Sequence, residues 1–311
     1  MTRIRLFPLL LALLLVAGCQ STAPPQQSPS ASMERTPMAP LLDGLGTHSM
    51  PITTQKPLVQ RYFNQGLVLA YGFNHAEAAR SFRAAQQLDP TCAICYWGEA
   101  LVLGPNINAP MPPAANSEAW SALQTALDLA ERTNPPKKET ALIQALSHRY
   151  AETAPEDRSA LDRAYADAMR TVARQYPDDP DVQTLFAEAL MDTTPWDYWE
   201  ADNSPKPVTK EFTAAIEKAL EQDLHHPGAN HLYIHAVESV HPEKGLAAAE
   251  RLDGLVPGGG HLVHMPGHIY IRTGRYHDAV RVNLDAAAAD ERYIAQTKAQ
   301  GFYPLMYYPH N

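Results

Sequence analysis

Small and aromatic residues recur along this chain with a period of about 34 residues, and this repeat constrains the fold more than any other feature. The pattern is clearest at 62–90 and 262–290, and a weaker copy at 226–259 directly precedes the second of these. Glycine stands where two antiparallel helices would cross, at Gly66 and Gly267. A helical hairpin of this kind cannot bury its apolar side alone, so successive hairpins should stack on one another.

The spacing inside each unit resembles that of the tetratricopeptide repeat. The residues that carry it are Tyr62, Gly66, Leu69, Ala78, Phe82, Ala85 and Pro90 in the first unit, and Gly267, Tyr270, Gly274, Tyr276, Ala279 and Ala286 in the later one. The resemblance implies an all-α fold, in which helical hairpins form a right-handed α-solenoid with a concave face.

Apolar residues keep a helical spacing between these units as well. Breaks that contain proline or glycine separate the helical segments, and no segment shows sustained strand alternation. The segments are 119–130, 141–150, 161–173, 182–191 and 212–220. We therefore predict that 56–311 is an array of about a dozen helices.

The end of the sequence, from Gly301 to Pro309, is aromatic and apolar and is followed at once by His310 and Asn311. A repeat array needs a terminal helix with a polar outer face. We therefore expect the solenoid over 56–311 to be incomplete at its C-terminal end. The alternative is a tail that folds back over the last hairpin.

Residues 1–18 have the pattern of a signal peptide, with Arg3 and Arg5 ahead of a short apolar stretch that ends in small residues. The residues before Cys19 resemble a bacterial lipobox. This resemblance implies cleavage before Cys19 and a lipid anchor on it, and Gln20 in the next position implies the periplasmic side of the outer membrane. More than one acyl chain would make this anchor stable. The alternative is an ordinary signal peptide followed by a chance cysteine.

Residues 19–55 are rich in proline, serine, glutamine and threonine and have little to bury, which predicts a disordered tether. Removing the signal peptide takes away two arginines and leaves 23 basic against 34 acidic residues. A chain this acidic repels phosphate backbones, so we expect no nucleic-acid partner. No later segment is long and apolar enough to span a bilayer, so the membrane would be reached through the lipid.

Cys92 and Cys95 form a C-x-x-C pair in a chain expected to be exported. A redox dithiol is one reading, but no thioredoxin-like βαβ pattern surrounds the pair. The spacing therefore favours a structural disulfide or two small residues at the start of a helix.

Two longer loops interrupt the array and hold the candidate contact residues Asn106, Asn108, Trp196 and Asp197. Insertions in solenoids map to one face, which is often the binding face. The alternative for Trp196 is that it covers a hydrophobic gap.

Most of the thirteen histidines lie between 225 and 277. His231, His235 and Glu238 fall at i, i+4 and i+7 and so share one face of a helix. A second row in the next repeat comprises His261, His264 and His268. Because neighbouring first helices of a solenoid pack side by side, we expect the two rows to face one another in one pocket of the groove.

Imidazoles that converge with a carboxylate suit Zn²⁺, Fe²⁺ or Cu²⁺. Asn230 and Arg272 lie next to the two rows and are further candidates for the groove, where Arg272 could orient an anionic substrate. The alternative is that some of the histidines are core residues bonded to carbonyls, or helix caps. Pro266 lacks an N–H, so its helix could begin near Met265, which would leave two of the histidines on a loop.

Taken together, these motifs resemble a family of large bacterial tetratricopeptide-repeat proteins. The stretches that carry the resemblance are 97–98, 104–108, 195–197, 230–238, 261–279 and 307–311. The resemblance implies a fold and implies that the motif residues belong together, but it implies no reaction.

Two functions fit these features. The first is a membrane-anchored binding or scaffold protein that holds a protein or peptide in a histidine-rich groove, with a metal ion in that groove. The second is a metal-dependent hydrolase or oxidoreductase that uses the same groove. The sequence contains no G-x-S-x-G nucleophile motif and no phosphate-binding loop, so it leaves open whether the protein is an enzyme.

Overall fold

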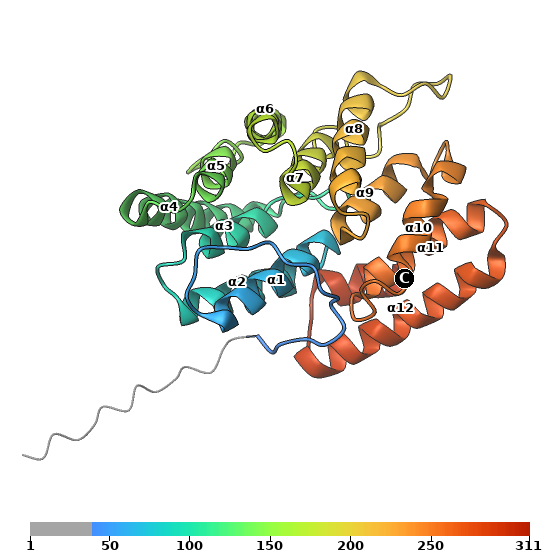
Figure 1. Ribbon diagram of the computed structural model, residues 1–311, viewed down its shortest axis with the longest axis horizontal. Helices are drawn as coiled ribbons and strands as arrows, with labels where there is room; N and C mark the ends of the chain where they lie inside the picture. The colour runs from blue at the N-terminus through green and yellow to red at the C-terminus, as the bar shows by residue number, and fades with distance from the viewer. Residues whose placement is uncertain (1–38) are drawn as a thin grey trace, which may run out of the picture. The chain divides into compact units, whose positions relative to one another are not determined.

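The computed structural model describes residues 39–311 and shows an all-helical chain (Figure 1). Residues 1–38, which include Cys19, the signal peptide and the first part of the predicted tether, lie outside the described residues. Residues 39–311 form thirteen α-helices and no strand, which confirms the all-α fold class. No helix in this range is both long enough and apolar enough to cross a membrane.

The α-helices are α1 (Pro57–Tyr71), α2 (His75–Leu88), α3 (Ala93–Val102), α4 (Asn116–Thr133), α5 (Lys137–Leu146), α6 (Ser159–Gln175), α7 (Pro180–Met191), α8 (Pro207–Gln222), α9 (Pro227–Val237), α10 (Leu246–Leu252), α11 (Gly260–Arg272), α12 (Tyr276–Thr297) and α13 (Tyr308–His310). Shorter helical turns are η1 (Pro113–Ala115), η2 (Pro242–Gly245) and η3 (Tyr303–Tyr307). The segments with helical spacing in the sequence fall on α4 to α8.

Proline and a capping side chain fix the start of two helices that matter for the site. α7 begins at Pro180, and the carboxylate of Asp179 accepts a hydrogen bond from the backbone N–H of Val182 at 3.0 Å. α9 begins at Pro227 and is capped by a ring nitrogen of His226. Both helices therefore have a defined first turn, which sets which of their faces is buried.

Consecutive helices pack on one another along the chain, as the repeat predicted. A Cβ on Gly66 in α1 would lie 2.8 Å from the ring of Phe82 in α2, and a Cβ on Gly267 in α11 would lie 2.9 Å from Oδ1 of Asn283 in α12. Only glycine allows helices to approach this closely. These two residues stand where the helices of a hairpin touch, as the repeat pattern predicted.

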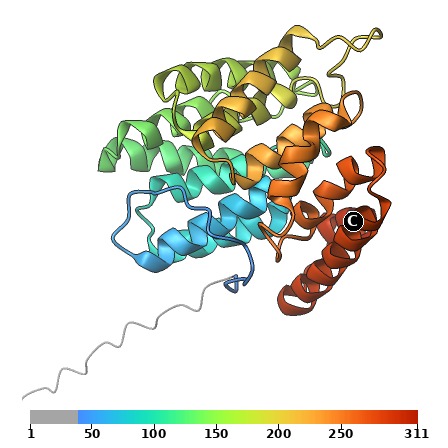
Figure 2. The same ribbon diagram turned by 45° about the vertical axis from the view of Figure 1, so that its right-hand side comes forward.

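The first hairpin also packs against helices from the far end of the chain (Figure 2). The hydroxyl of Tyr293 in α12 lies 3.3 Å from Oε2 of Glu77 in α2, and α1 contacts α9. The sequence predicted a concave groove lined by histidines of α9 and α11. In the structure the turn between α1 and α2 lies over these histidines, because Phe73 at that turn is buried against rings on both helices.

Residues 39–55 are not a disordered tether, which corrects the predicted boundary at 55. Ala39, Leu45 and Met50 are buried in the core. The segment packs along α1, where the side chain of Gln65 accepts a hydrogen bond from the backbone N–H of Leu42 at 2.8 Å. Glutamine and glutamate side chains accept hydrogen bonds from three backbone N–H groups of this segment, which helps it to pack without secondary structure of its own.

The last residues fold back over α11 and α12. Tyr303 and Tyr307 are buried, and Asn311 donates a hydrogen bond from Nδ2 to Asp290 of α12 at 2.7 Å. These residues cover part of the last hairpin. The outer face of α12 nevertheless exposes apolar side chains, among them Tyr276, Val280 and Leu284.

Cys92 and Cys95 form a buried disulfide at the start of α3, in agreement with the prediction of a structural disulfide for the C-x-x-C pair.

Candidate metal centre

α9 and α11 carry most of the site. α11 begins at Gly260, so Pro266 lies inside the helix and the expectation of a start near Met265 is wrong. Gly260 also lies close to α12, because a Cβ there would meet the carboxylate of Asp290 at 2.1 Å. The glycine run before α11 thus permits a close contact with α12, and the histidines of α11 are held on a rigid helix.

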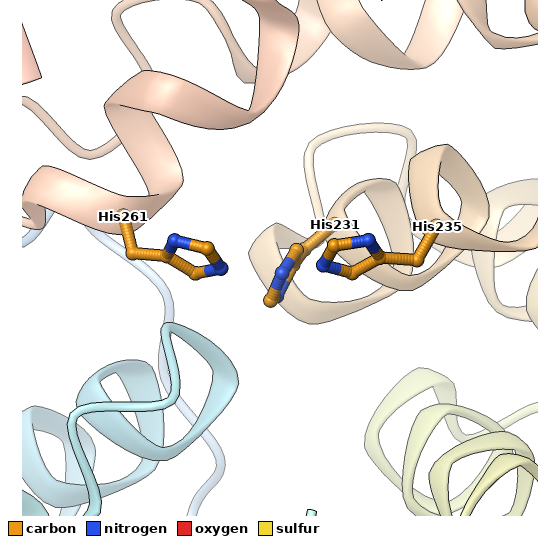
Figure 3. Close-up of side chains that lie close together, drawn as sticks. All are labelled: His231, His235 and His261. Carbon is orange, nitrogen blue, oxygen red and sulfur yellow. The ribbon is translucent and has the colours of Figure 1, made fainter. Parts of the chain in front are cut away.

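Three histidines form what we call the inner triad: His231 and His235 of α9 and His261 of α11. One ring nitrogen of each lies within 4.8 Å of those of the other two, and the side chains are turned toward one another (Figure 3). The residues are 0%, 2% and 0% exposed. The sequence predicted that the two rows would converge, and these three residues do so in the interior.

Each ring of the inner triad is oriented by an acceptor at Nδ1. Nδ1 of His231 lies 2.5 Å from the carbonyl oxygen of Tyr71, and Nδ1 of His235 lies 2.9 Å from Oε1 of Glu238. Nδ1 of His261 lies 3.1 Å from Oδ1 of Asn311. A carbonyl, a carboxylate and an amide oxygen all require the ring proton to sit on Nδ1. The three Nε2 atoms then carry free lone pairs.

Nothing among residues 39–311 uses these lone pairs. The Nε2 atoms of all three rings are buried and have no hydrogen-bond partner within that range. Burial lowers the pKa of each of the three rings, and the neighbouring histidines lower the pKa values of His231 and His261 further. The rings are therefore neutral at ordinary pH, which is the form that coordinates a metal ion.

An aromatic wall closes the inner triad. The ring centroid of Phe73 lies 4.5 Å from that of His231 and 5.8 Å from that of His261. Trp196, a predicted contact residue, is 49% exposed, and its ring centroid lies 5.1 Å from that of His235. These rings exclude water and lower the local dielectric constant, which strengthens any ion–ligand interaction inside.

A second group, the outer triad, comprises His264 and His268 of α11 and His310 of α13. Their ring nitrogens again lie within 4.8 Å of one another. Nε2 of His264 is 2.8 Å from Nε2 of His268 and 3.1 Å from Nε2 of His310. The sequence placed His264 and His268 with the other ligands in one pocket, whereas the structure divides the histidines between two adjacent triads.

Glu238, whose carboxylate the sequence placed among the candidate ligands, connects the two triads. Its Oε1 accepts from His235 of the inner triad, and its Oε2 accepts from His268 of the outer triad at 2.6 Å. Burial alone would raise the pKa of Glu238, but the hydrogen bonds from these histidines outweigh it and lower that pKa. A buried carboxylate anion that holds two Nδ1–H groups is a typical outer partner of metal-bound histidine.

A third group, His48, Asp181 and His226, has a different hydrogen-bond pattern. Nδ1 of His226 accepts from the backbone N–H of Ala229 at 3.1 Å, so its proton lies on Nε2, which donates to Asp181 at 3.2 Å. Oδ1 of Asp181 also accepts from Tyr71 at 2.8 Å and lies 2.9 Å from Nε2 of His48. This group is a satisfied hydrogen-bond network.

Several predicted groove residues have internal roles. Asn230 is buried: it donates to the carbonyl oxygens of Leu224 and His226 and accepts from Arg251. Asn106 accepts two backbone hydrogen bonds within its own loop. The predicted residue Asp197 pairs with Lys206.

Two other predicted groove residues lie close to the site. Nδ2 of Asn108 is 3.4 Å from the hydroxyl of Tyr307, so it contacts the C-terminal tail. Arg272 is directed at Glu238, with 3.3 Å between Nη2 and Oε2, so its guanidinium is already paired.

Sequence reasoning missed the residues that complete the site from outside the two rows. His310 supplies the third ring of the outer triad, while Asn311 and the Tyr71 carbonyl orient rings of the inner triad. His310 and Asn311 lie in the stretch 307–311, which is one of those that carry the family resemblance. That resemblance was the sequence signal that could have pointed to these two residues. No spacing rule connects Tyr71 or Phe73 with histidines so far along the chain.

Comparison of the sequence with protein-family models and with curated proteins gives no match.

Proposed function

We propose that this chain is a metal-binding protein and that the inner triad of His231, His235 and His261 holds a transition-metal ion. One observation carries the proposal: the three rings are turned toward one another, their buried Nε2 atoms have no partner among residues 39–311, and all three Nδ1 atoms are held by acceptors. A buried polar atom left unpaired costs about 1–3 kcal/mol. Three such atoms facing one point are accounted for by an ion that accepts all three lone pairs.

The chemistry of the ligands narrows the choice of ion. Neutral imidazole suits Zn²⁺, Cu²⁺ and Fe²⁺, whereas Mg²⁺ and Ca²⁺ prefer oxygen ligands. Three protein ligands leave a coordination position for water or a substrate, as in catalytic zinc sites. This open position supports the metal-dependent hydrolase or oxidoreductase as one form of the proposed function.

A specific surface favours a second function, the binding of a protein or peptide. Tyr276, Val280 and Leu284 are 66%, 59% and 67% exposed and follow one another at i, i+4 and i+8 along α12. They make an apolar stripe, and such stripes on soluble proteins mark interaction sites. The right-handed tetratricopeptide-type solenoid belongs to this proposal, because repeat solenoids bind partners through extended surfaces.

The proposed location is the cell envelope. The lipobox-like residues before Cys19 support a lipid anchor, and Gln20 supports the periplasmic side of the outer membrane. In this position the protein would meet metal ions that enter from outside the cell.

The test is the metal content of the full chain purified without a histidine tag. We expect stoichiometric zinc, copper or iron that survives dialysis. The ion of the inner triad should be lost in His231→Ala and in His261→Ala, while the exposed His277 serves as a matched control in His277→Ala. An inner-triad variant that keeps the full metal content of the wild type would overturn the proposal.

A further inference from the structure

We infer that the outer triad of His264, His268 and His310 holds a second metal ion next to the first. The inference rests on the proposed metal-binding function and extends it from one ion to a two-ion centre. α11 places His264 and His268 one turn apart on one face, and the C-terminal tail brings His310 to them. The three rings come from two segments that are far apart in the sequence.

The hydrogen bonds at Nδ1 again fix where the ring protons lie. Nδ1 of His264 lies 2.7 Å from Oδ1 of Asn283, and Nδ1 of His268 lies 2.6 Å from Oε2 of Glu238. Both partners are acceptors, so both rings carry their proton on Nδ1. Their Nε2 atoms then present lone pairs to each other across only 2.8 Å. Two lone pairs at this distance repel unless a cation lies between them.

A divalent metal ion is a cation that accepts both lone pairs and leaves the rings neutral. Tetrahedral Zn–N bonds of about 2.0–2.1 Å place two ligand nitrogens about 3.3 Å apart, so small ring movements would open the triad to receive an ion.

The two triads are close enough to act as one centre. The ring centroids of His235 and His268 are 5.6 Å apart, and those of His261 and His264 are 5.9 Å apart. Glu238 binds one ring of each triad through its two oxygens. This carboxylate is thus the outer partner of both ions, and it partly offsets the repulsion between two cations.

The two positions differ in their access to solvent. The inner triad is buried, whereas the side chain of His268 is 14% exposed and His310 lies at the surface. The outer position is therefore the more accessible of the two to water or an external ligand. The outer triad is also the solvent-facing side from which an ion would reach the inner triad.

The test is the number of ions bound per chain. The full-length apo-protein is loaded with excess Zn²⁺ alone, freed of unbound ion by gel filtration and analysed for zinc. We expect two ions in the wild type, one in His310→Ala, one in His261→Ala and two in the control His277→Ala. The side chain of His310 is exposed in the turn α13, so its replacement by alanine leaves the core intact. Far-ultraviolet circular dichroism and a thermal melt identify any variant that fails to fold, and His268→Asn is a second variant of the outer triad.

The outcomes separate this inference from the proposal on which it rests. One ion in the wild type, kept in His310→Ala and lost in His261→Ala, overturns the second ion and leaves the inner site standing. One ion that is lost in His310→Ala and kept in His261→Ala overturns the inner site and the two-ion centre together. No retained zinc in a folded wild type overturns both.

Discussion

Oε2 of Glu238 in α9 lies 2.6 Å from Nδ1 of His268 in α11, so the carboxylate links two helices as well as two histidine triads. The other oxygen of Glu238 accepts from His235 on its own helix. Because both oxygens are used, a neutral replacement cannot serve both rings. A single substitution at Glu238 should therefore affect the binding of both proposed ions.

We expect Glu238→Gln to weaken metal binding by about 10–100-fold, the usual effect of removing an outer partner of a ligating histidine. Glutamine keeps the shape but has one acceptor oxygen, so one of the two rings loses its orientation. Competition with a chelator of known affinity measures the change. Glu243→Gln is the matched control, because Glu243 lies on the surface and pairs only with His241 among residues 39–311. Unchanged affinity in Glu238→Gln would remove the linking role.

Two glycines at equivalent contacts make a second prediction. Both Gly66→Ala and Gly267→Ala overpack a helix crossing, at a cost of about 1–3 kcal/mol. The better helix propensity of alanine offsets about 1 kcal/mol of this cost. Only the Gly267 variant pushes on Asn283, which orients His264. We therefore expect lower melting temperatures for both variants, but weaker zinc binding for Gly267→Ala alone. Equal zinc affinity in the two variants would count against the role of Asn283.

The buried carboxyl of Asp290 predicts a pH dependence of stability. Burial raises its pKa from 3.8 to about 6, although hydrogen bonds from Asn311 and Tyr303 lower it. Between about pH 4 and pH 6 the native state therefore keeps a proton that the unfolded chain releases, and stability falls as pH rises through this window. At about 1.4 kcal/mol per pKa unit, the loss is about 3 kcal/mol.

The asparagine of Asp290→Asn cannot ionise. The free energy of unfolding of this variant should therefore lack the decrease between about pH 4 and pH 6 that we expect for the wild type. Urea unfolding of metal-free protein at pH 4, 5, 6 and 7 measures it, with the exposed Asp285→Asn as the control. A wild type and an Asp290→Asn variant with parallel pH profiles would show that the carboxyl is not perturbed.

The proposed lipid anchor gives the fourth prediction. Cells grown with a clickable fatty acid should label the wild type but not Cys19→Ala, because the proposed anchor attaches its first acyl chains to the cysteine sulfur. The Cys92→Ala and Cys95→Ala double variant is the control and should label like the wild type, since that disulfide is buried in the helical body. Labelling of Cys19→Ala at the wild-type level would exclude the anchor.

The parts of the fold that depend on local patterns could be predicted from the sequence. Apolar spacing located α4 to α8, and Gly66 and Gly267 located two helix crossings. The i, i+4 spacing of His231 and His235 correctly placed both rings on one face of α9. Each of these features involves residues within one hairpin, where helix geometry alone determines which side chains are neighbours.

The unpredicted parts depend on contacts between distant segments. Asn230 stands beside a metal-ligand candidate in the sequence but packs into the core, because the helix turns adjacent residues to different faces. Phe73, which covers the inner triad, precedes α9 and α11 in the sequence, and His310, the third ring of the outer triad, follows them. Residues 39–55 pack because partners in α1 and α5 accept their backbone hydrogen bonds, which composition does not reveal.

The hydrogen bond from His231 to the Tyr71 carbonyl joins residues 160 positions apart, and Asn311 orients His261 from the last position of the sequence. During synthesis the hairpin of α1 and α2 emerges well before the segments that carry these histidines. Ion loading would therefore have to follow the folding of α9, α11 and residues 303–311 onto that hairpin. A bound ion would then distinguish finished molecules from chains that are still folding.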